Sequence, residues 1–143
     1  MASCTVKNDK VENFRYLIDE FADIKVIRYT VPGWDKLSLR QKEYAYHLSE
    51  AAKWGRDIAW DQNCSGNIAL RHTLEDILEN YKGERSGQQW DDFVVYAKRV
   101  FFANGVHHHY AEDKFFPECS REYFRSLGAS EEVLDYVYDT EKW

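Results

Sequence analysis

The 143-residue sequence has no apolar run near the roughly 20 residues that a membrane-spanning helix needs, so we expect no membrane span. It holds only 2 Pro and 7 Gly, which excludes collagen-like and linker-rich proteins. Basic residues are also few, because 19 Lys and Arg stand against 25 Asp and Glu and the net charge is -6. Without a basic stripe to contact phosphates, we expect no nucleic-acid partner.

Cysteine is scarce as well. Cys4, Cys64 and Cys119 form no Cys-x-x-Cys pair, so we expect reduced thiols and no disulfide framework. The stretch Ala2-Ser3-Cys4 is similar to the end of a bacterial lipoprotein signal, but no apolar segment precedes it. As written, the sequence predicts a cytoplasmic protein. If Ala2-Ser3-Cys4 is instead the end of a trimmed signal, it predicts a cell-envelope lipoprotein. Residues 1–8 are predicted to be a disordered N-terminus.

Apolar residues make up 44% of the sequence and aromatic residues 16%, enough for a packed core. We therefore expect residues 9–143 to form a single, mainly α domain of about five to six helices. One short extended segment is predicted near 24–31, where β-branched residues are followed by Pro32-Gly33. No second strand is evident, so this segment is either a connector or has its partner outside this sequence.

Capping residues set the predicted helix ends. Asp9 with Glu12 opens a first helix that continues to Phe21, and Ser38 with Gln41 opens a long one over about 38–60. The long helix has an apolar face that we expect to be buried, with His47 as a core histidine. Further helices are predicted over about 67–82 and 88–103, with Asn104-Gly105 as a left-handed end and Ser120 and Ser130 beginning two short helices.

The densest group of chemically versatile side chains is His107-His108-His109-Tyr110, directly after that helix end. Three neighbouring histidines cannot all face one ion. One interpretation is a loop at the helix end whose imidazoles hydrogen-bond backbone and carboxylate groups, and another is the rim of a substrate cleft, with Asn104 beside it. A metal site built from His107, His109 and Asp113, or Glu112, is the alternative, but it lacks an evident fourth ligand. A cysteine nucleophile at Cys64 or Cys119 has no orienting partners nearby in the sequence.

Five stretches in order carry a resemblance to a known family. They are FADIKVIRY with VPG (residues 21–33), LSLRQKE (37–43), GRDIAWDQN (55–63), NYKG (80–83) and NGVHHHY with KF (104–115). Together they resemble the N-terminal region of bacterial dipeptidyl-peptidase III, a zinc exopeptidase family, over about residues 12–125. The resemblance implies a larger two-lobed parent that releases dipeptides from short peptides.

In that family, zinc lies on a His-Glu-x-x-Gly-His motif in the other lobe, and this sequence reaches Trp143 without one. The resemblance therefore implies a non-catalytic N-terminal portion: zinc belongs to the parent, no cofactor is expected in this chain, and the partners are the remainder of the peptidase chain and short peptides. No catalytic residue is carried over, and His107, His108, His109, Tyr110 and Asn104 are expected to line the substrate cleft. The alternative is a stand-alone helical interaction or metal-binding module that uses the His107–Tyr110 corner.

Overall fold

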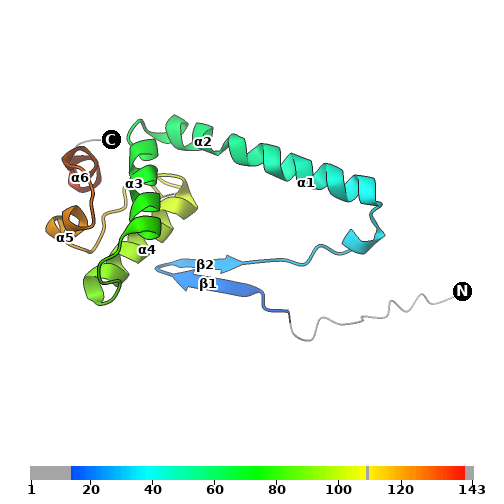
Figure 1. Cartoon of the computed structure of the whole chain (residues 1–143), viewed down its shortest axis with the longest axis horizontal. Helices are drawn as coiled ribbons and strands as arrows, with labels where there is room; N and C mark the ends of the chain where they lie inside the picture. The colour runs from blue at the N-terminus through cyan, green and yellow to red at the C-terminus, as the bar shows by residue number, and fades with distance from the viewer. Residues whose placement is uncertain (1–13, 109, 141–143) are drawn as a thin grey trace, which may run out of the picture. The chain divides into compact units, whose positions relative to one another are not determined.

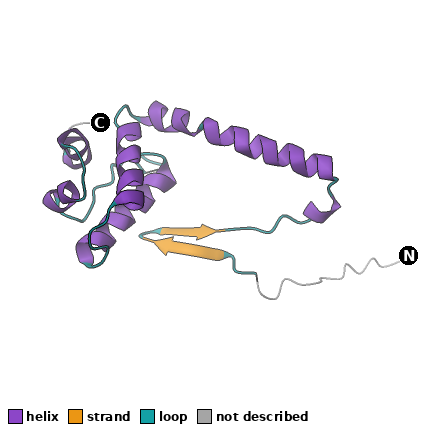
Figure 2. Cartoon of the chain, in the orientation of Figure 1, coloured by secondary structure: helices purple, strands orange, loops and turns teal. Residues whose placement is uncertain are grey.

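The computed structural model describes residues 14–108 and 110–140, and the chain divides into two compact units between Lys36 and Leu37. In the described residues the first unit holds a two-stranded sheet and the second holds six α-helices (Figures 1 and 2). The prediction of a mainly α protein with a short extended segment is confirmed. The predicted disordered stretch 1–8 and the signal-like Ala2-Ser3-Cys4 lie outside the described residues.

The sheet of the first unit is an antiparallel hairpin of β1 (Leu17–Phe21) and β2 (Ile24–Ile27). Phe21 pairs with Ile24 across a two-residue turn, in which Ala22 adopts a left-handed φ of 48°. A two-stranded hairpin is marginal in water without a further layer on its apolar face. Its burial is limited to the residues beside the turn, because Phe21 and Ile24 are buried whereas most of the strand residues are not.

The hairpin corrects two predictions. A helix that continues to Phe21 is wrong for residues 17–21, which form β1; the predicted start at Asp9 lies outside the described residues. The extended segment near 24–31 forms a strand only over residues 24–27, and its partner lies within this chain, directly before it. The physical reason is that pairing with β2 satisfies the backbone of residues 17–21, which local periodicity does not reveal.

The second unit begins with α1 (Leu39–Trp54), opened by the predicted capping box. The Ser38 backbone N–H donates to Gln41 Oε1 at 2.9 Å and the Gln41 N–H donates to Ser38 Oγ at 3.3 Å. The predicted single helix over 38–60 is instead two helices, because α1 ends at Gly55 and α2 (Arg56–Asn63) follows. Glycine is a poor helix-interior residue, and here it ends one helix and begins the next.

No residue of α1 is buried. Its apolar side chains face solvent: Leu48 is 52% exposed and Trp54 is 89% exposed, and Leu39, Tyr44 and Tyr46 are exposed as well. The prediction that this face is buried, with His47 in the core, is therefore wrong, since His47 is exposed too. The apolar stripe that the sequence pattern identifies includes Tyr44 and Leu48, and within the described residues of the second unit nothing packs over it.

The core lies between α3 (Asn67–Asn80), α4 (Gln88–Ala103) and α6 (Glu131–Tyr138), and α3 and α4 run side by side (Figure 1). Its fully buried side chains come from α2, α3, α4, α5, α6 and the loops between them: Trp60, Leu70, Leu74, Phe93, Val100, Val106, Phe124, Leu134 and Val137. The bounds of α4 are those predicted, and Asn104 ends it with a left-handed φ of 56°.

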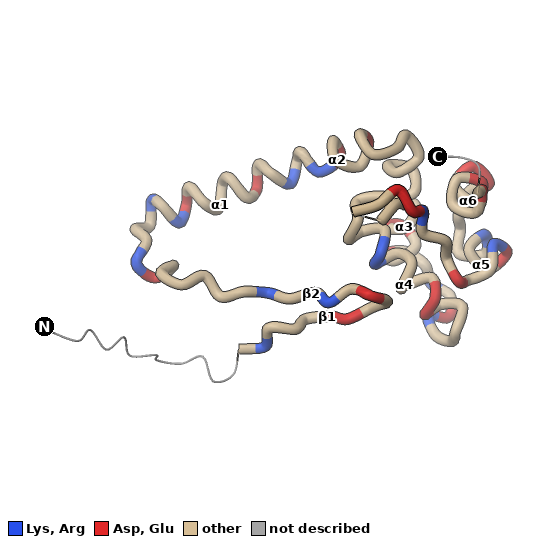
Figure 3. The backbone as a smooth tube through the Cα atoms, turned by 180° about the vertical axis from the view of Figure 1, so that it is seen from behind, with Lys and Arg blue, Asp and Glu red and all other residues tan. Residues whose placement is uncertain are grey.

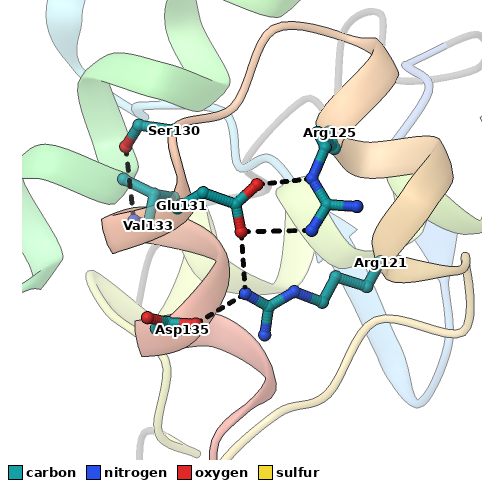
Figure 4. A network of polar contacts seen from close by, with 6 residues as sticks. All are labelled: Arg121, Arg125, Ser130, Glu131, Val133 and Asp135. Carbon is teal, nitrogen blue, oxygen red and sulfur yellow. Dashed lines mark hydrogen bonds and ion pairs between the residues drawn. The ribbon is translucent and has the colours of Figure 1, made fainter.

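Short helix α5 (Arg121–Ser126) carries basic residues and α6 carries acidic ones (Figure 3), and ion pairs join the two helices (Figure 4). Both predicted caps are confirmed: Ser120 accepts from the Tyr123 N–H and Ser130 from the Val133 N–H. Across the two helices, Glu131 accepts from Arg125 and from Arg121, and Arg121 also donates to Asp135 at 2.5 Å.

The same arginines shift the titration of Glu131. The hydrogen bond from Arg125, and then that from Arg121, lowers the pKa of this carboxyl from 4.5 to about 2. Because the pKa is depressed in the folded chain, the stabilisation is present above pH 4.5 and is lost as the pH falls toward 2. The pairs are solvent-exposed, so this network orients α6 on α5 more than it stabilises the domain.

Within the described residues, no helix combines the length and the apolar character required to cross a lipid bilayer.

Candidate functional site

A pocket of about 660 Å³ lies at the C-terminal end of α4, entirely within the second unit. This volume is in the range of small-molecule and peptide sites. Its lining mixes carboxamides, imidazoles, a carboxylate, an aromatic ring and backbone: Asn63, Phe102, Ala103, Asn104, Gly105, His107, His108, Ala111 and Glu112.

Local backbone structure positions the pocket wall. Asn104 ends α4 in the left-handed conformation, which turns the chain sharply and lets the following residues run back across the helix end. A short antiparallel bridge then pairs His107 with Lys114. The His108 N–H donates to the Asp113 carbonyl at 2.8 Å, and the Phe115 N–H donates to the Val106 carbonyl at 2.6 Å. The two imidazoles therefore stand on a braced strand rather than on a loose loop.

The structure brings together three of the five predicted site residues, since Asn104, His107 and His108 all line the pocket. Tyr110 is not part of the lining and is 89% exposed. His109 lies outside the described residues. Among residues 14–108 and 110–140, no three His, Cys, Asp or Glu side chains converge as metal ligands do. The alternative metal site of His107, His109 and Asp113 stays a prediction, because it includes His109.

Among the lining residues that were not predicted as site or metal-ligand residues, Asn63 and Phe102 have the largest side chains. Asn63 comes from the end of α2, 41 residues before Asn104, and its Nδ2 approaches the Asn104 carbonyl at 3.4 Å. Phe102 lies on the last turn of α4 and is 43% exposed, which places an aromatic surface at the pocket. An exposed Phe at a helix end is a usable signal, whereas the position of Asn63 depends on how α2 packs. Glu112 was considered only as a metal ligand.

Among the described lining residues, Glu112 supplies the only carboxylate, and no lysine or arginine is present. Burial, and then the positive charge of Lys114, lowers the pKa of His107 below its usual 6.5. The imidazole is therefore neutral near pH 7 and offers one donor and one acceptor nitrogen. Because the folded-state pKa is the lower one, the unfolded chain takes up this proton first, and stability is lost as the pH falls through 6.5.

Within the part of the chain that the structure describes, the two cysteines, Cys64 and Cys119, do not add a nucleophile to this site. Cys119 is buried, its thiol lies 3.7 Å from the Tyr138 hydroxyl, and burial raises its pKa. A reactive thiol needs the opposite shift, toward the thiolate. Cys64 is half-buried and is engaged by the Tyr136 hydroxyl. With two imidazoles, two carboxamides and one carboxylate in its lining, the pocket is suited to hydrogen-bonding a ligand rather than to covalent chemistry.

The effect of Lys114 on His107 is directly testable. Replacing Lys114 with Gln removes the charge, so we expect the pKa of His107 to rise part of the way back toward 6.5, burial being the larger cause of its depression. Replacing Lys114 with Arg keeps the charge and should leave the pKa of His107 near its original value. The measurement is an NMR titration of the imidazole C2–H resonance in the three proteins. Equal shifts in both variants would contradict the electrostatic cause.

No protein-family model matches the chain, and no curated protein does either. The resemblance to dipeptidyl-peptidase III therefore stays a prediction that rests on its five sequence stretches.

Proposed function

We propose that this chain is the N-terminal, non-catalytic portion of a dipeptidyl-peptidase III-like zinc metallopeptidase, which releases N-terminal dipeptides from oligopeptides. The observation that carries the proposal is the exposed α1, a 16-residue helix with an apolar stripe and no buried residue. Contiguous exposed apolar surface marks a region that another protein surface covers. In such a peptidase, the remainder of the polypeptide supplies that cover.

We propose that the pocket at the end of α4 also contributes to peptide binding in the parent enzyme. The imidazoles of His107 and His108, with the carboxamides of Asn63 and Asn104, can form hydrogen bonds with peptide-backbone amides. Phe102 offers an apolar surface for a side chain. In the parent enzyme this pocket forms part of the wall along which short peptides lie.

The zinc motif of that peptidase family does not occur in this sequence. The sequence contains no His-Glu dipeptide, so it has no His-Glu-x-x-Gly-His motif. No three candidate ligands gather among the described residues. The metal, and the chemistry that follows from it, therefore belong to the remainder of the parent protein, and the isolated chain is inactive.

The decisive experiment compares the 143-residue chain with the product of the complete reading frame. We expect the complete product to contain the zinc motif and to release dipeptides from a chromogenic dipeptidyl substrate in a zinc-dependent manner. The isolated chain should stay at the buffer blank with or without zinc, because it lacks the metal site. Zinc-dependent turnover by the isolated chain would overturn the proposal.

A matched substitution tests the pocket role in the complete enzyme. His107→Ala removes a lining imidazole, and loss of one such contact, at about 1–3 kcal/mol, corresponds to roughly 5- to 150-fold in kcat/KM. Zinc content should stay unchanged. His72→Ala is the control, because His72 is exposed on α3 and lies beside Glu75, away from the pocket. Loss of zinc in the His107 variant would assign this imidazole to the metal instead.

The exposed α1 face also supports a second candidate, a stand-alone helical interaction module. Tyr110, 89% exposed beside the pocket, would then belong to the docking corner. A native stop codon after Trp143 together with an inactive purified protein would favour this candidate over the peptidase portion.

A further inference from the structure

One fully buried polar side chain, Asn67, joins three segments that are far apart in the sequence. Asn67 is the first residue of α3 and is 0% exposed. Its Nδ2 donates to the Trp60 carbonyl at 3.2 Å, and its Oδ1 accepts from the Val106 N–H at 3.2 Å and from the Tyr136 hydroxyl at 2.9 Å. Because a carbonyl only accepts and an N–H only donates, these partners fix the orientation of the amide.

The pocket wall lies directly against this amide. A Cβ atom on Gly105 would come within 2.5 Å of Asn67 Nδ2, so the lining backbone at Gly105 can approach only because it has no side chain. The next residue, Val106, is held by its N–H to Asn67 and by its carbonyl to Phe115. The strand that carries His107 and His108 therefore starts from a position set by Asn67.

Helix α6 is attached to the same wall in two places. The Tyr136 ring packs against Gly66, where a Cβ would be 2.7 Å from three ring atoms, and the Tyr136 hydroxyl donates to Asn67 Oδ1. On the other side of the bridge, Lys114 Nζ donates to the Tyr136 and Asp139 carbonyls at 2.6 Å each. Both strands of the His107–Lys114 bridge are thus tied to the C-terminal end of α6.

We propose that Asn67 is a positioning residue for the pocket, and that it couples the seating of α6 to the placement of His107 and His108 through Tyr136. The coupling concerns the pocket alone and does not rest on the proposed peptidase function. By linkage it is reciprocal: a ligand that binds the ordered pocket holds α6 more firmly, and a loosened α6 weakens the pocket. A change in the position of α6 therefore alters the pocket.

The experiment compares two tyrosines of α6 in the 143-residue protein. Tyr136→Phe removes the hydroxyl that reaches Asn67, whereas Tyr138→Phe removes a hydroxyl that donates to the Cys119 carbonyl at 2.8 Å. We expect Tyr136→Phe to shift the imidazole resonances of His107 and His108 and to speed hydrogen exchange at the Val106 amide about five- to tenfold, as for one buried hydrogen bond weakened. Tyr138→Phe should leave the imidazole resonances of His107 and His108 unshifted. It should change the hydrogen-exchange rate of the Val106 amide by no more than about twofold.

Two further variants separate the causes. Cys64→Ala removes the other partner of the Tyr136 hydroxyl and should leave the Val106 exchange unchanged. Asn67→Ala should reproduce and exceed the Tyr136→Phe effect; where circular dichroism shows that it is unfolded, the two tyrosine variants decide. The proposal fails if Tyr136→Phe leaves residues 106–108 undisturbed, or if Tyr138→Phe disturbs them equally, since a merely structural role of α6 predicts equal effects.

Discussion

Leu70→Ala is expected to lower the free energy of unfolding by about 2–5 kcal/mol, whereas Leu48→Ala changes it by about 0.5 kcal/mol or less. Both substitutions remove the same atoms from an α-helix. Leu70 is 0% exposed at the centre of the α3–α4–α6 core, and its removal leaves a cavity. Leu48 is 52% exposed on α1, where water already contacts the side chain. The difference between the two variants measures how far the core extends along the chain.

Chemical denaturation of both variants, followed by far-UV circular dichroism at low protein concentration, gives the two free energies. A loss of more than about 2 kcal/mol in Leu48→Ala would mean that α1 is buried in solution. It would also remove the main support for a missing covering surface. A small loss in Leu70→Ala would indicate a loosely packed core.

Local signals in the sequence predicted the second unit well. The period of apolar residues between 88 and 103, with Asn104-Gly105 behind it, gives the bounds of α4 as observed. Ser38, Ser120 and Ser130 cap helices in the predicted places. These features depend on contacts three or four residues apart, which a single sequence displays directly.

The hairpin was missed because its decisive interaction is pairing. Leu17, Ile18 and Phe21 fit a helical face as well as a strand over so short a span. The turn gives little warning either, since Ala22 holds a positive φ where glycine or asparagine is usual. Likewise, the apolar stripe of α1 is visible in the sequence, but periodicity cannot say whether another surface covers it.

The site was predicted in part for the same reason. The histidines and Asn104 are neighbours in the sequence and could be found as a cluster. The sequence predicts Asn67 only as the first residue of a helix. In the structure its side chain contacts Val106, 39 residues later, and Tyr136, 69 residues later. A buried amide that satisfies three distant groups becomes recognisable only when the packing of α3, α6 and the pocket wall is known.

The second large effect concerns self-association of the isolated chain. With nothing over the apolar stripe of α1, we expect chains to associate through it, so the weight-average mass in sedimentation should rise above 17.0 kDa as concentration increases. The double variant Tyr44→Glu, Leu48→Glu places two charges four residues apart on that face. Covering one apolar side chain contributes about 1.5–3 kcal/mol, and about 1.4 kcal/mol corresponds to a factor of ten, so we expect the association to weaken by about tenfold or more.

Leu39→Glu is the matched control. Leu39 lies on the same helix and is 72% exposed, but it is nine residues from Leu48 and therefore on the opposite face. Helix content should be retained in all three proteins, because no residue of α1 is buried. If the Leu39 variant dissociates the chains as well as the double variant does, general charge repulsion explains the result. If the unmodified chain stays at 17.0 kDa at every concentration, the exposed stripe does not drive association. The stripe then no longer supports the proposal that another part of a larger protein covers it.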